Sequence, residues 1–225
     1  MKRHFDEELA ELNKEILRMG ALTEESIYKS IEALKTLSMK KAKQVIAEDD
    51  RINELELVID EKCLDLIALY QPMAVDLRFI VMAMKICTDL ERIADLAVDI
   101  CERVLEMADK PLLKPLIDIP KLATLAQGMV KEAIDAFINR DAGQAREVIL
   151  RAEPEADNLR NLVQSELIND YILKDPSAAP RAVSLLLVAR HLERICDHAT
   201  NIAEDAIYMV EAKVVKHRLG VLKET

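Results

Sequence analysis

The 225-residue sequence has a net charge of −10, with 51% hydrophobic and 32% charged residues. An acidic chain without a compact basic patch repels nucleic acid, so we expect no nucleic-acid partner. The sequence has no run of about 18 apolar residues and no N-terminal signal-peptide core. These absences predict a cytoplasmic protein with no membrane span.

The sequence offers few turn signals, because it contains four glycines and seven prolines. This composition favours a small number of long helices. In chain order, the helical patterns are interrupted weakly near Ser38, strongly at Gln71-Pro72, and then within segments 111–120, 141–143 and 174–176. The predicted fold is all-α, with six long helices in two pseudo-repeated antiparallel three-helix bundles. We place the first repeat at 1–110, a proline-rich linker at 111–120 and the second repeat at 121–225.

The strongest evidence for a repeat is the stretch LERIAD at 90–95, which returns as LERICD at 192–197. Apolar residues around each copy follow alternating spacings of 3 and 4, from Ile86 to Val104 and from Val188 to Met209. Such heptad spacing buries one stripe of a helix against its neighbours. The most economical explanation is a duplicated three-helix unit.

Acidic residues recur around these motifs at helical spacing. They stack at i, i+4 and i+8 on the last helix of each half, and a second pair precedes them on the middle helix. The candidate positions are Glu91, Asp95, Asp99, Asp49 and Asn53 in the first half, and Glu193, Asp197, Asn201, Glu153 and Asp157 in the second. Placed on the heptad, the stripe on each last helix faces away from the apolar seam. Oxygen ligands of this kind suit Mg²⁺, Mn²⁺ or iron, although a docking surface for a partner and a plain solvated face stay open.

Other constellations are weaker. His191 and His198 flank the second motif on one helix face, where a surface or capping role is expected and an auxiliary ligand role for His198 is the alternative. Neither half carries the Glu-x-x-His of di-iron bundles, and no catalytic motif occurs, so we expect no enzyme activity. Arg92 and Arg194 are candidates for partner or phosphate binding, against the simpler expectation of bridges to acids on an adjacent helix. The four cysteines form no CxxC pair and are expected to be buried thiols.

The run QPMAVDLRFIVMAMKICTDLERIADLAVDIC, together with VARHLERICDHATNIAE, resembles the PhoU family. The segments HFDEELAELNKEILRMG and IAEDDRINELE are also similar to that family, so the resemblance reaches to about residue 212. It implies a negative regulator of the phosphate-starvation response in a two-component system. It also implies an adaptor between the high-affinity phosphate ABC transporter, through its ATPase subunit, and a PhoR-type sensor histidine kinase. Family members are often homodimers.

The resemblance also implies metal clusters on E(D)xxxD motifs, which correspond here to the pairs Glu91/Asp95, Glu193/Asp197 and Glu153/Asp157. The metal is open between iron, zinc, magnesium and manganese. One departure is Asn53, an amide where a carboxylate is expected, which predicts weaker binding in the first half. A second is Ala94 and Cys196, where the family often has glycine. The rival interpretation is a carboxylate-bridged metalloenzyme or metal-storage bundle.

Overall fold

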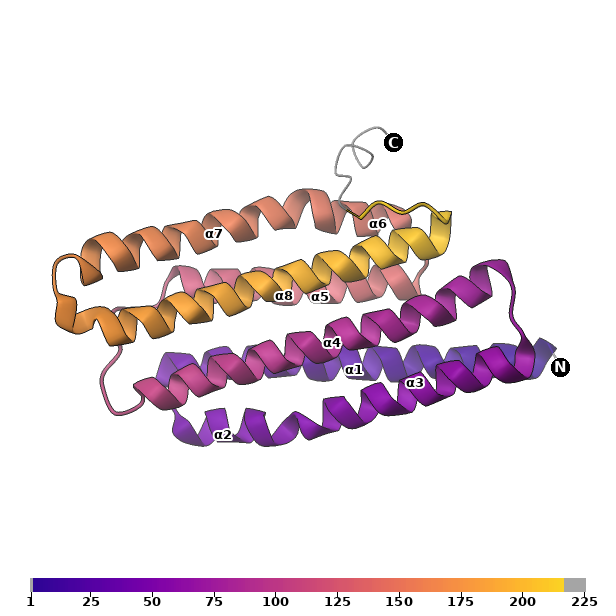
Figure 1. The fold of residues 1–225 in the computed structure, drawn as a ribbon, viewed down its shortest axis with the longest axis horizontal. Helices are drawn as coiled ribbons and strands as arrows, with labels where there is room; N and C mark the ends of the chain where they lie inside the picture. The colour runs from indigo at the N-terminus through magenta and orange to yellow at the C-terminus, as the bar shows by residue number, and fades with distance from the viewer. Residues whose placement is uncertain (1, 217–225) are drawn as a thin grey trace.

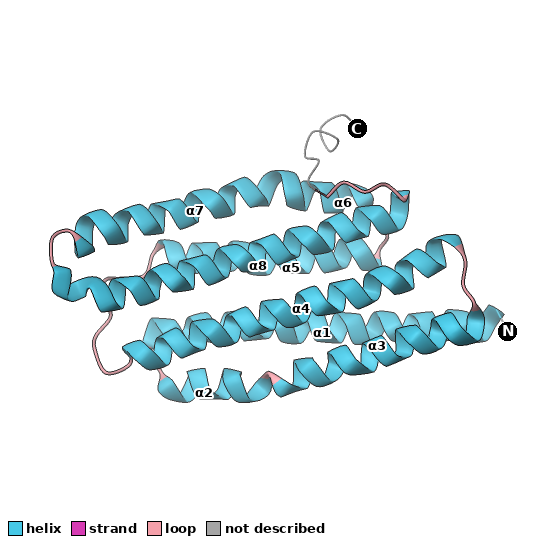
Figure 2. Ribbon diagram, in the orientation of Figure 1, coloured by secondary structure: helices cyan, strands magenta, loops and turns pink. Residues whose placement is uncertain are grey.

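The computed structural model describes the backbone of residues 2–216 and the side chains of 4–150 and 154–216. Every regular element of this part is helical, which confirms the all-α prediction (Figures 1 and 2). The elements in order are α1 (Lys2–Thr36), α2 (Met39–Glu48), α3 (Asp50–Tyr70), α4 (Ala74–Met107), α5 (Asp118–Ile138), α6 (Ala142–Glu147), η1 (Val148–Ala152), α7 (Glu153–Glu166), η2 (Leu167–Ile172), η3 (Pro176–Ala178) and α8 (Ala179–Glu211).

The expected breaks between helices occur where local chemistry requires them. The Ser38 side chain accepts a hydrogen bond from the Lys41 amide and caps α2, and Asp141 caps α6 through the amides of Gly143 and Gln144. Gln71 ends α3 in the left-handed conformation, with φ of 48°. Asp175 caps η3 through the Ser177 amide. These four positions confirm the punctuation predicted from the sequence.

The connection between the halves is shorter than predicted. Helix α5 begins at Asp118, so Pro120 lies in its first turn rather than in the linker. A proline is tolerated there because the first-turn amides have no partner within the helix. The connection is anchored by Lys114, which is 6% exposed and forms an ion pair with Glu166 on α7.

The middle helix of each half is broken, where one continuous helix was expected. In the first half, α2 passes into α3 at Asp49. In the second half, the π-helical segment η1 separates α6 from α7. The sequence explains the difference: Ile46 matches Ile149, 103 positions on, whereas Asn53 matches Asp157, 104 positions on. The second half therefore carries one extra residue, which a π turn accommodates.

The two predicted bundles share one core. Helices α1, α4, α5 and α8 form the centre, and α2–α3 and α6–α7 flank it on opposite sides (Figure 1). The most extensive packing joins α4 to α8, one helix from each repeat. The rings of Phe79 on α4 and Phe137 on α5 also stack across the repeats, with centroids 4.8 Å apart. None of the described helices is long and apolar enough to cross a membrane.

Close packing of α1 on α5 predicts a cost for a single added methyl group. A Cβ at Gly20 would lie 2.5 Å from Cδ1 of Ile134, which is 3% exposed. We expect Gly20→Ala to lower the free energy of unfolding by about 1–3 kcal/mol, because the buried side chain must shift. Ile134→Val removes Cδ1, so the double variant should recover part of this loss in urea denaturation.

The matched control is Gly128→Ala on α5, where an added Cβ would meet no atom within 4 Å. Alanine is the better helix former, so this variant should gain roughly 0.5–1 kcal/mol. Equal effects of the two glycine substitutions would contradict the close approach at Gly20.

Candidate functional site

The first acid group comprises Asp49, Asn53, Glu91 and Asp95, at the boundary between α3 and α4. Asn53 donates a hydrogen bond from Nδ2 to Oδ2 of Asp49 at 3.2 Å. Asn53 Oδ1 and Glu91 Oε2 are buried and accept no hydrogen bond within the described part of the chain. The structure thus brings together four of the five residues predicted in the first half, and the exception is Asp99.

The carboxylates of this group are only partly neutralised by their neighbours. Burial raises the pKa of the Asp49 carboxyl; the hydrogen bond from Asn53 opposes this shift, and the nearby Asp95 adds to it. Burial also raises the pKa of Glu91, Asp95 reinforces the effect, and Arg92 opposes it. Arg92 contacts Glu91 and Asp95, each at 3.4 Å, but its side chain is 58% exposed. The group therefore holds more negative charge than this one arginine neutralises.

The second acid group comprises Glu193, Asp197 and Asp157, between α7 and α8; the side chain of Glu153 lies outside the described residues. Glu193 is only 7% exposed, although the heptad placed it away from the apolar seam. Its carboxylate meets Arg190 at 2.9 Å and Arg160 at 3.5 Å, and Arg160 lies 3.7 Å from Asp157. Burial raises the pKa of Asp197, and Arg190 opposes that shift. Two arginines thus neutralise this group more fully than the first.

Two predicted ligands lie elsewhere. Asp99 meets Nδ1 of His191 at 3.6 Å, and Asn201 donates to Asp89 at 3.4 Å, both across the α4–α8 interface. A step of four residues advances about 40° around a helix, so two steps carry the side chain away from the middle helix and toward the other repeat. The residues of the predicted stripe therefore lie on two helix faces: one face meets the middle helix of the same repeat, and the other meets the last helix of the other repeat.

The histidines occupy that same interface rather than a free surface or a helix cap. The side chain of His198 is 19% exposed and its Nδ1 lies 2.7 Å from Asp89. Burial lowers the pKa of His191, an effect that Asp99 opposes. Both rings therefore pack between the repeats, and the closest recorded partner of His198 is Asp89 rather than a member of the second acid group.

The sequence analysis did not predict Glu56, which lies near the first acid group. Glu56 accepts a hydrogen bond from Thr88 at 3.0 Å and lies close enough to raise the pKa of Glu91. Its position, three residues after Asn53, was the available signal.

Of the two arginines proposed for partners, Arg92 contacts acids of its own helix rather than of an adjacent one, and Arg194 is exposed. Among the described side chains, no three His, Cys, Asp or Glu residues converge closely enough to hold a metal as they stand.

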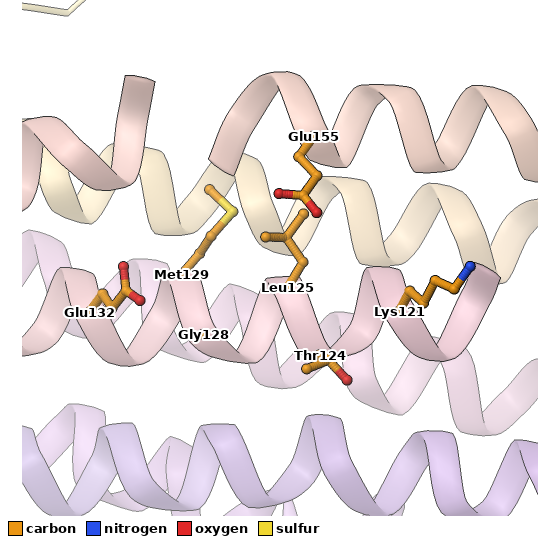
Figure 3. A pocket seen from close by; sticks show the side chains of 7 residues that line it. All are labelled: Lys121, Thr124, Leu125, Gly128, Met129, Glu132 and Glu155. Atoms are coloured by element: carbon orange, nitrogen blue, oxygen red, sulfur yellow. The ribbon is translucent and has the colours of Figure 1, made fainter. Parts of the chain in front are cut away.

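A separate hollow of about 410 Å³ lies between α5 and α7 (Figure 3). Its floor is apolar at Leu125, Gly128 and Met129, and Lys121 and Glu155 stand at its margin. It contains no residue of either acid group. No nucleophile with an adjacent base lines it, so it adds nothing in favour of an enzyme.

Comparisons with known proteins agree with this architecture. The model of the PhoU domain matches twice, at residues 16–104 and 119–206. The chain belongs to the PhoU family. A relative from Aquifex aeolicus, named a phosphate-specific transport system accessory protein PhoU homolog, is 42% identical over 94% of this chain and 95% of its own length.

Two solved PhoU structures superpose closely on the chain. PhoU from Pseudomonas aeruginosa is 35% identical with a TM-score of 0.87, covering 93% of this chain and 100% of its own. The phosphate transport system regulatory protein PhoU from Streptococcus pneumoniae is 30% identical, also with a TM-score of 0.87, over 94% and 99%. The PhoU resemblance inferred from the LERI motifs is confirmed.

Proposed function

We propose that the chain is an accessory and regulatory protein of phosphate transport, and that it acts as a negative regulator of the phosphate-starvation response. The observation that carries this proposal is family membership over nearly the whole length, with relatives named as transport-system accessory proteins. An accessory family favours a role without catalysis. In this role the protein would work at the inner face of the membrane, between the transporter ATPase subunit and a PhoR-type sensor kinase.

The acidic helix faces support docking as the mechanism. A chain of net charge −10 is steered toward basic surfaces on its partners, and such steering weakens with salt. Affinity purification of the tagged chain from cells grown with ample phosphate should retain the transporter ATPase subunit and the kinase at low salt. Retention of neither protein would overturn the adaptor proposal.

We propose further that the first acid group binds a divalent or trivalent metal ion through Asp49, Glu91 and Asp95, with Asn53 as an additional oxygen donor. The ion would neutralise carboxylates and so alter the charge that the α3–α4 face presents. The buried Oδ1 of Asn53, which accepts no hydrogen bond within the described part of the chain, supports this assignment. Asp157, Glu193 and Asp197 form the corresponding candidate site in the second repeat.

The charges around the two acid groups predict which of them binds a metal ion at the lower metal concentration. The amide of Asn53 alone suggested weaker binding in the first half, but Arg160 and Arg190 already occupy the carboxylate of Glu193. We expect the first group to bind Mn²⁺ at lower concentration than the second in isothermal titration. Arg160→Gln should tighten the second site by several-fold and leave the first unchanged; tighter binding at the second site in the parent chain would contradict this order.

The rival metalloenzyme or metal-storage interpretation has less support. Its ligands would need to face the interior of a bundle, whereas Asp95 and Asp157 have side chains 44% and 58% exposed. Oxidase or hydrolase turnover by the Fe²⁺- or Mn²⁺-loaded chain would favour the rival and count against an accessory protein.

A further inference from the structure

The two repeats are related by an internal pseudo-two-fold axis that passes between α4 and α8. Glu91 and Glu193 are 102 positions apart, and this offset exchanges positions on the two helices. It maps the contact of Asp99 with His191 onto the contact between Asn201 and Asp89. The exchange places Ala94 opposite Cys196 near the axis, and both are buried.

This axis relates two grooves at opposite ends of the α4–α8 interface. The open groove, between the end of α4 and the start of α8, has a volume of about 470 Å³. Its equivalent, between the start of α4 and the end of α8, retains about 150 Å³. Four positions correspond through the 102-residue offset: Arg103 with Asp205, Glu106 with Tyr208, Ser184 with Met82, and Leu187 with Lys85.

The equivalent groove is smaller because the chain itself lies against it. After α8 ends, Val214, Val215 and Lys216 contribute to its lining, and Val215 is 3% exposed within the hydrophobic core. At the open groove the chain after α4 contributes only Asp109 and Lys110 to the lining. It then passes Pro111, whose carbonyl accepts a hydrogen bond from Arg181, and continues to α5. Val183 and Leu187 are consequently 46% and 38% exposed.

The charges of the two grooves differ in sign. The walls of the equivalent groove carry Lys85 against Glu204 and Asp205. The segment that lies against them is basic, with Lys213 and Lys216 around two valines. The walls of the open groove carry Arg103, Lys110 and Arg181 with Glu106 and Asp109. Arg103 is already paired with Glu106 at 2.8 Å and with Glu102 at 3.4 Å, so Lys110 and Arg181 remain against Asp109. Charge complementarity then favours an acidic segment in the open groove.

We propose that the open groove binds an extended segment of a partner protein, in which two adjacent aliphatic residues are flanked by carboxylates. The aliphatic pair covers Val183 and Leu187 as Val215 covers the equivalent groove, and the carboxylates face Lys110 and Arg181. The internal segment 212–216 is the template for this mode of binding. The site is independent of the acid groups, and its failure would leave the proposed accessory role intact.

The test compares two labelled peptides with the full chain by fluorescence anisotropy. The first carries the core AEVVE and the second carries AKVVK, the sequence of residues 212–216. We expect the acidic peptide to bind several-fold more tightly. Leu187→Ser, which removes the aliphatic side chain at an exposed position without adding charge, should weaken that binding about tenfold, since it removes the apolar contact. Arg103→Asp, which installs the residue of the equivalent groove, should reverse the preference between the peptides.

The control is Val58→Ser, at a 51% exposed position on α3 that lines neither groove, and it should leave binding unchanged. Tighter binding of AKVVK to the parent chain would make the tail of a second copy the occupant and overturn the partner proposal. Absence of binding by both peptides, or binding that Leu187→Ser does not change, would also overturn it. Thermal unfolding of each variant confirms that a loss of binding is not a loss of fold.

Discussion

Addition of Mn²⁺ is expected to raise the melting temperature of the metal-free chain, because a cation at the first acid group relieves repulsion among Asp49, Glu91 and Asp95. At a free metal concentration of 100 times the dissociation constant, binding to the folded state alone contributes about 2.7 kcal/mol. For a chain of this size that corresponds to roughly 5–10 °C. Differential scanning fluorimetry across a metal titration measures the shift.

The same shift should depend on pH in a defined direction. Folding raises the pKa values of Asp49 and Glu91, so their contribution to stability is greatest at acidic pH and is lost as the pH rises through the raised values. The metal replaces the missing proton, and its effect should therefore be large at neutral pH and small in acid. Glu91→Gln should raise the metal-free melting temperature at neutral pH and reduce the metal response. An unchanged metal response in that variant would exclude the first acid group as the site.

Phe137→Ala is expected to weaken the packing between the two repeats strongly. Its ring is fully buried and stacks on Phe79 with an angle of 9° between the ring planes. Removal of a buried phenylalanine costs about 3–5 kcal/mol, which corresponds to a fall in melting temperature of roughly 6–20 °C at 2–4 °C per kcal/mol. Calorimetric unfolding measures both the shift and the number of transitions.

Tyr28→Ala is the control, because this aromatic side chain is 56% exposed and its loss should change stability by less than about 0.5 kcal/mol. A loss below about 1 kcal/mol in Phe137→Ala would mean that the stack does not hold the repeats together. Two separated transitions in the parent chain would contradict a shared core.

The sequence was sufficient for the features that repeat at fixed spacing. The doubled LERI motif and its heptads predicted the last helix of each half, and the breaks near Ser38 and at 141–143 predicted helix boundaries, because such signals act within a few residues. Asp99 and Asn201 were misassigned because spacing along one helix does not reveal which neighbour each face meets. Arg160 escaped notice because its contact with Glu193 spans two helices. The packing of Val215 against the core likewise depends on the arrangement of whole helices, which local patterns do not encode.

The α4–α8 interface, in which Ala94 and Cys196 are buried near the internal axis, affects how the stability of the chain depends on protein concentration. A single repeat would leave the interhelical face of α4 uncovered, and it could bury that face only by pairing with another molecule, so its stability would vary with dilution. The connection through Lys114 supplies the second repeat within the same chain at a fixed effective concentration. Because both repeats belong to one molecule, the midpoint at which this interface unfolds should not change with the concentration of the protein.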